Sequence, residues 1–139
     1  MKKETFSNIA EGTHEGNITK VAKTNITERY TLVKIDTSNP AMVDICTDSD
    51  LPIGVATDEA SAGDIVNVAL LGSADTIKAI ASETIVAGKL LRPTDDGKIA
   101  PIGTAAGSYN CIGIALNSTI ANSMVEVLSC VPTQYTIGE

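Results

Sequence analysis

The chain has 139 residues, and its 10 Lys and Arg against 17 Asp and Glu give a formal net charge of −7. A negative chain repels phosphate backbones, and no basic stripe with interleaved aromatic side chains is present, so we expect no direct nucleic-acid partner. No stretch approaches the roughly 20 apolar residues of a membrane span, and the charged start lacks the apolar region of a signal peptide, so we expect no membrane partner.

The first sixteen residues are polar, contain the only histidine, His14, and show no apolar period of either kind. They predict a flexible, extended N-terminal arm over 1–16, followed by a single β domain over 17–139. The chain contains one Phe and no Trp. We therefore expect an aliphatic core, in which the many β-branched residues favour strands over helices.

From Ile18 onward, short apolar or alternating runs are separated by turn residues, a pattern typical of strands. The Asp96-Gly97 pair is the best hairpin signal, because both residues tolerate the positive φ angles of a two-residue turn. The segment 78–87 admits a short helical turn, but its Ile, Thr and Val content favours strand or loop. The pattern predicts a short C-terminal tail after Pro132 and ten strands, within 18–23, 29–35, 41–46, 53–57, 65–71, 76–81, 88–92, 98–102, 111–116 and 124–131.

An internal repeat organises the chain. The segment 53–70 aligns without gaps on 112–129, at an offset of 59 residues, with identical residues such as Gly54 and Gly113. The same offset upstream pairs Leu32 with Leu91, so the repeat is expected over about 30–70 and 89–129. Each copy has an apolar face that it cannot bury alone. The sequence therefore predicts an all-β fold, a small barrel or sandwich of the β-tulip kind, built from two pseudo-repeated halves.

Residue types that support catalysis or metal binding are few and scattered. His14 lies in the arm, where no partner would orient it as a base. Asp48 and Asp50 imitate the start of a calcium loop, but Pro52 and Ile53 interrupt it, and Ile53 takes the place of the required glycine. The cysteines lack the spacing of zinc ligands and are expected to be reduced. We therefore expect no enzyme, no catalytic residue, no cofactor and no metal; the three cysteines are Cys46, Cys111 and Cys130.

Three segments give the chain a resemblance to a known family: 11–22 (EGTHEGNITKVA), 53–72 (IGVATDEASAGDIVNVALLG), and the pair IGIAL and MVEVL within 112–128. In these it resembles the capsid decoration, or cement, proteins of tailed bacteriophages. The resemblance implies a protein made in the host bacterial cytoplasm that sits on the outer capsid surface of the virion. It would bind the major capsid protein as a homo-oligomer, with a trimer favoured, and stabilise contacts between coat subunits. The family has no catalytic residues to carry over.

The candidate contacts to the capsid or to other subunits fall into two groups. Two lysines and a phenylalanine in the arm would supply charge and an apolar anchor, or form a disordered start. Three tyrosines would serve as interface anchors, or simply as half-buried strand residues. The alternative function is a non-catalytic β-sandwich binding module for a glycan or other cell-surface ligand, which should show clustered aromatics. The six candidates are Lys2, Lys3, Phe6, Tyr30, Tyr109 and Tyr135.

Overall fold

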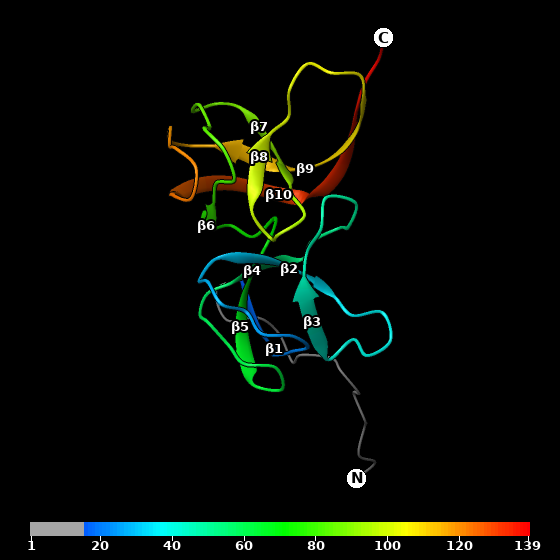
Figure 1. The fold of residues 1–139 in the computed structure, drawn as a ribbon, viewed down its shortest axis with the longest axis vertical. Helices are drawn as coiled ribbons and strands as arrows, with labels where there is room; N and C mark the ends of the chain where they lie inside the picture. The colour runs from blue at the N-terminus through cyan, green and yellow to red at the C-terminus, as the bar shows by residue number, and fades with distance from the viewer. Residues whose placement is uncertain (1–15) are drawn as a thin grey trace.

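The computed structural model describes residues 16–139, and this part of the chain is built from strands, turns and loops without a helix (Figure 1). The all-β prediction is confirmed. No helix among these residues is long and apolar enough to cross a membrane. The strands are β1 (Asn17–Ala22), β2 (Thr31–Ile35), β3 (Met42–Ile45), β4 (Gly54–Ala56), β5 (Ile65–Leu70), β6 (Ile77–Ile80), β7 (Leu90–Pro93), β8 (Ile99–Pro101), β9 (Gly107–Ala115) and β10 (Met124–Ile137).

Strands β1 to β5, here called the N-terminal unit, form a closed barrel in the order β1-β3-β2-β4-β5. The barrel closes because β1 pairs with β5 on one side and, in parallel, with β3 on the other, where Val21 lies opposite Met42. Alternation along β5 places Val66 and Val68 in the interior, with Asn67 between them on the outside. A strand that is apolar at every second residue supplies one buried face.

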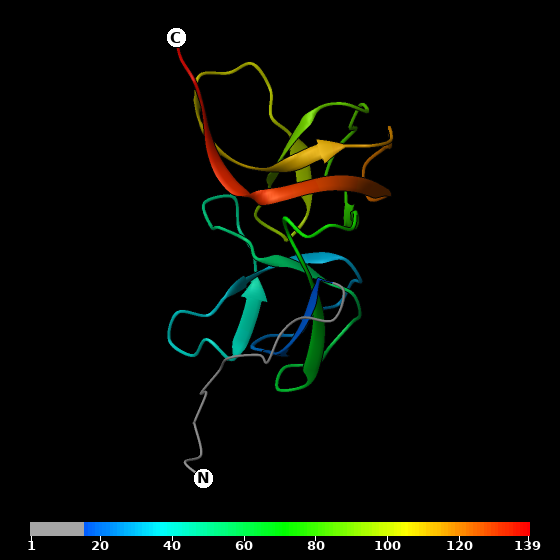
Figure 2. The same ribbon diagram turned by 180° about the vertical axis from the view of Figure 1, so that it is seen from behind.

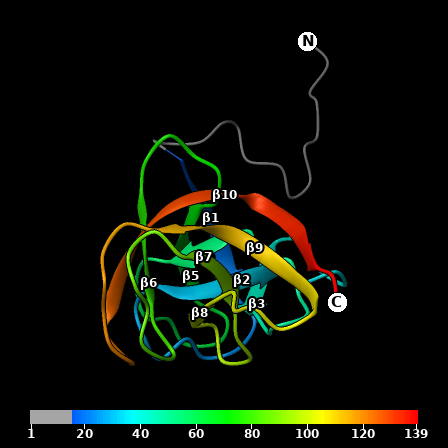
Figure 3. The ribbon, with the colours of Figure 1, turned by 90° about the horizontal axis from the view of Figure 1, so that it is seen from above.

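Strands β6 to β10, the C-terminal unit, form a second sheet in the order β6-β10-β9-β7-β8. Its edge strands meet only through a single parallel bridge between Ala81 and Ile99, so the sheet is curled but remains open. Figures 1 and 2 show the two units stacked along the long axis of the molecule, and Figure 3 looks down this stack. The small-barrel architecture expected from the sequence is thus confirmed, with one closed unit and one curled unit.

Each strand of the N-terminal unit has a counterpart in the C-terminal unit, including β1, which corresponds to β6. For most pairs the counterparts are 59 residues apart. Val55 of β4 lies opposite Ala69 of β5, and their counterparts Ile114 and Leu128 lie opposite each other in β9 and β10. The structural correspondence therefore reaches further toward the N-terminus than the segments 30–70 and 89–129.

The second strand of each unit departs from this constant offset. Val33 of β2 lies opposite Gly54, whereas Leu91 of β7 lies opposite Gly113. The counterpart of Val33 is therefore Leu91, at an offset of 58 residues, and Leu32 corresponds to Leu90. The pairing of Leu32 with Leu91 in the sequence alignment is wrong by one residue, which in a strand means the opposite face.

A common hydrophobic core joins the two units. Leu32, Cys46 and Val55 point outward from the N-terminal barrel and are at most 1% exposed, because the concave side of the C-terminal sheet covers them. Each fully buried aliphatic side chain contributes about 1.5–3 kcal/mol relative to its exposed state. The residues of the C-terminal unit in this core are Ile77, Ala79, Ala81, Ile85, Leu91, Ile99, Ile112, Ala115, Val125 and Val127.

The predicted hairpin turn at Asp96-Gly97 also contacts the other unit. The Leu32 N–H donates to the Gly97 carbonyl at 2.8 Å, and the Gly97 N–H donates to the Cys46 carbonyl at 3.1 Å. Gly97 has a φ of 74°, and a Cβ atom at this position would lie 2.5 Å from Cγ2 of Thr31. Only glycine combines this backbone conformation with so close an approach.

The C-terminal end differs from the expected tail. Strand β10 passes Pro132 and pairs with β9 as far as Ile137, opposite Gly107. The pairing shifts register between Ser129 and Thr133, and this irregularity accommodates a proline that has no N–H to donate. The stretch that the sequence suggested as a tail therefore forms one strand of a protruding hairpin.

Candidate functional site

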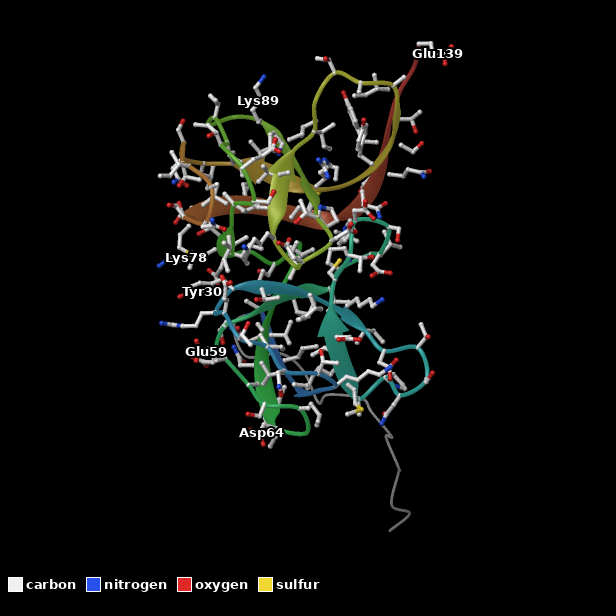
Figure 4. The ribbon with its side chains drawn as sticks, viewed as in Figure 1. Tyr30, Glu59, Asp64, Lys78, Lys89 and Glu139 are labelled. Atoms are coloured by element: carbon white, nitrogen blue, oxygen red, sulfur yellow. The ribbon has the colours of Figure 1, made fainter. Side chains whose placement is uncertain are left out.

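Tyr30 lies at the boundary between the two units. Its φ is 67°, an uncommon value for a residue with a side chain, and its N–H donates to the Ala56 carbonyl at 2.6 Å. Its ring centroid lies 5.0 Å from the Arg29 guanidinium and 5.9 Å from the Lys78 ammonium. Figure 4 shows Tyr30 and Lys78 on the same side of the molecule, one in each unit. These contacts show Tyr30 as part of the seam between the units.

The other two tyrosines lie together at the far end of the C-terminal unit. Tyr109 of β9 is directly opposite Tyr135 of β10, so the structure brings these two candidates into one cross-strand pair. The Tyr109 hydroxyl donates to the Ala105 carbonyl at 2.9 Å, and Tyr135 is 43% exposed. The arm candidates Lys2, Lys3 and Phe6 lie outside the described residues.

The charged residues are distributed very unevenly along the chain. All 10 Lys and Arg and 15 of the 17 Asp and Glu lie within residues 1–98, leaving only Glu126 and Glu139 in the last 41 residues. Those residues form β8, β9 and β10. The sheet surface of the C-terminal unit is therefore nearly uncharged, whereas most of the remaining chain is acidic.

Exposed apolar side chains gather on this uncharged part. Of the ten large hydrophobic side chains that are exposed among the described residues, seven lie in β9, β10 or the loop between them. Outward positions alternate with buried Val125 and Val127 along β10. Contiguous exposed apolar surface on a soluble protein marks an interaction site. We define the apolar face as Leu90, Ile114, Leu116, Met124 and Leu128.

The repeat shows that this kind of face is built to be covered. Leu90, Ile114 and Leu128 lie opposite one another across three adjacent strands, and Ile114 and Leu128 are 37% and 53% exposed. Their counterparts in the N-terminal unit are Leu32, Val55 and Ala69, which the C-terminal unit covers. The same row of positions is thus buried in one unit and open in the other.

The acidic turn that imitates a calcium loop makes protein contacts instead. Asp50 accepts a hydrogen bond from Lys34 Nζ at 2.8 Å and another from the Thr47 hydroxyl at 2.7 Å. The hydrogen bond from Lys34 holds the pKa of Asp50 below its ordinary value of 3.8. Among residues 16–139, no group of three or more His, Cys, Asp or Glu side chains is placed to hold a metal ion.

The comparisons with known proteins agree with one another. The sequence model described as phage cement protein matches residues 10–130. A solved structure of the head fiber gp8.5 N base in bacteriophage phi29 is similar in fold, with a TM-score of 0.66 and 21% identity, covering 86% of this chain and 98% of that chain. A comparison with curated protein sequences found no match. The family match spans both units, and the chain therefore belongs to the phage cement protein family, whose members are structural proteins of the phage head.

Proposed function

We propose that this chain binds the outer surface of a phage head and stabilises contacts between major capsid protein subunits. Its membership of the cement family supports a role on the head. The observation that carries the specific proposal is the open apolar face, since its counterpart in the N-terminal unit is fully covered. We propose that the coat protein covers the open face.

The chemistry of the apolar face suits a protein partner. Burial of apolar surface contributes roughly 25 cal/mol per Å² removed from water, and this face would lose few charges to desolvation. Its row of Leu90, Ile114 and Leu128 is interrupted by no charged side chain, while Glu126 and Lys78 pair beside it. The acidic remainder of the chain would remain in solvent, away from packaged DNA, which supports an outer rather than an inner location.

The arm and the oligomer extend this proposal. Lys2, Lys3 and Phe6 would reach a neighbouring coat subunit, and a homo-oligomer, with a trimer favoured, would hold several coat subunits at once. Multivalent contact makes release slow even where each contact is weak. Removal of residues 1–15 should then weaken head binding while the fold of residues 16–139 persists; unchanged binding would show that the arm has no part in it.

Cosedimentation with purified, decoration-free heads tests the docking face. The variant Leu128→Glu places a charge in the middle of the apolar face and should reduce binding at least tenfold, because a buried carboxylate would lack a partner. Ile65→Glu is the matched control, since Ile65 is 73% exposed on the other unit and receives the same charge. Equal binding of both variants would remove the apolar face as the capsid contact.

A further inference from the structure

The hairpin at the end of β9 and β10 leaves the body of the molecule. Residues 107–111 and 133–137, here called the ribbon, pair only with each other among the described residues. Strand β6 pairs with β10 only over Met124–Val127, and β7 reaches β9 only at Gly113 and Ile114. The ribbon therefore has two open edges, one on each strand, and in Figure 1 it stands at the margin of the molecule beside the C-terminus.

These open edges lack the usual protection. Natural edge strands carry charges, particularly Lys, that prevent pairing with another chain. The ribbon has no charged side chain between Glu126 and Glu139 on β10, and none on β9. Pro132 alone interrupts the edge of β10. An isolated two-stranded ribbon is also marginally stable in water, so further strands are needed to hold it.

The two faces of the ribbon differ as the two faces of a small barrel do. One face carries Tyr109 opposite Tyr135, and the other carries Ser108 opposite Thr136, whose hydroxyls lie 3.1 Å apart. Tyr135 is 43% exposed, although its aromatic ring is suited to burial. Additional strands at both edges would enclose the tyrosine face and leave the hydroxyl face in solvent.

We propose that the open edge of β10 pairs with the open edge of β9 of a second copy of this chain, head to tail, so that the ribbons of three copies close a six-stranded barrel. This specifies the oligomer of the proposed function, and rests on it only in that respect. A head-to-tail contact repeats until a ring closes, and closure leaves no free edge. Two ribbons supply only four strands, whereas the N-terminal unit already encloses aliphatic side chains with five.

Charge selects a second copy as the occupant. Chains with a net charge of −7 repel one another over most of their surface. The ribbon is uncharged, so pairing there brings no like charges into direct contact. It also carries both complementary edges itself, one on β9 and one on β10, which no other described segment does.

Light scattering on the full chain tests this directly. The wild-type mass should be three times the 14.4 kDa of one chain. Lysines at exposed ribbon positions, in the double variant Gln134→Lys with Thr136→Lys, should reduce the mass to that of one chain, because charged edges resist pairing. The control Thr27→Lys with Ser38→Lys adds the same charge at exposed loop positions and should retain the wild-type mass.

A wild-type mass of 14.4 kDa, or a ribbon variant that keeps the wild-type mass, would overturn the inference. Circular dichroism of each variant establishes that the fold persists. Hydrogen exchange adds a second readout, since the amides of 133–137 should exchange at least tenfold more slowly in wild type than in the ribbon variant. Head binding is measured separately: a wild-type monomer that binds heads overturns only the ribbon, and a trimer that fails to bind overturns only the docking proposal.

Discussion

Tyr109 lies directly opposite Tyr135 across the ribbon of β9 and β10. The two residues are 26 positions apart in sequence, and each is a plausible contact residue on separate grounds. Their pairing makes them one feature, at the end of the molecule where charge is scarce. It also separates them from Tyr30, which lies at the seam between the two units beside Lys78.

Replacing Tyr135 should loosen the ribbon without unfolding the body. A cross-strand aromatic pair contributes about 0.5–1.5 kcal/mol, and neither tyrosine belongs to the two hydrophobic cores. In Tyr135→Ala, amides of 107–111 should therefore exchange faster, while the global denaturation midpoint changes little. A large fall in that midpoint would show that the ribbon is coupled to the core.

The Gly97 turn should stabilise the whole chain, because it joins the two units. Gly97→Ala imposes a side chain on a left-handed residue beside Thr31, and we expect a loss of about 1–3 kcal/mol in the free energy of unfolding. We further propose that residues 17–139 unfold as one domain, in a single transition. Gly103→Ala is the control, since a Cβ atom there meets nothing within 4 Å. Two separated transitions in wild type would contradict the single domain.

The ion pair of Lys34 and Asp50 should give a pH-dependent contribution. The folded-state pKa of Asp50 lies below 3.8, so its stabilisation is present above about pH 4 and is lost as the pH falls through the folded pKa. Both side chains are partly exposed, so Asp50→Asn should cost only about 0.5–1 kcal/mol at pH 7. Urea denaturation at pH 7 and pH 2.5 should show this difference shrinking in acid.

Asp58→Asn is the matched control for that experiment. Asp58 and Arg29 lie 3.8 Å apart and are both well exposed, so their removal should have no measurable effect at either pH. A cost that is equal at both pH values for Asp50→Asn would mean that lost packing, rather than lost charge, explains the change.

The cysteines should differ in reactivity. Burial raises the pKa of Cys46 to about 12, so its thiolate is scarce at pH 8, and the side chain lies in the core between the units. Burial also raises the pKa of Cys130, but this residue is only partly buried. Mass spectrometry after alkylation should show Cys130 modified before Cys46 in native protein. Equal labelling rates would mean that the two units separate readily.

The positions of the strands could be predicted because turn residues and apolar runs are local signals. Each of the ten expected segments contains part of one observed strand. Register is not local, and this is why the constant offset misplaced Leu32 relative to Leu91. The continuation of β10 was missed for a related reason: Pro132 reads as a strand end, and only pairing with β9 shows that the strand resumes.

The candidate surface was only partly predictable. The tyrosines were found by residue type, whereas the apolar face of Ile114 and Leu128 was missed because their alternation with buried valines looked like ordinary strand patterning. The available signal was the absence of charge over 99–125 and 127–138. That pattern alone does not tell which apolar residues point outward, because this depends on the register with β7 and β9.

The most direct test of the proposed role measures how well heads retain their DNA. DNA-filled, decoration-free heads would be heated with and without saturating protein, and DNA release followed by nuclease sensitivity. We predict a higher release temperature with wild-type protein, and no increase with Leu128→Glu. Wild-type protein that binds the heads but leaves the release temperature unchanged would contradict a stabilising function.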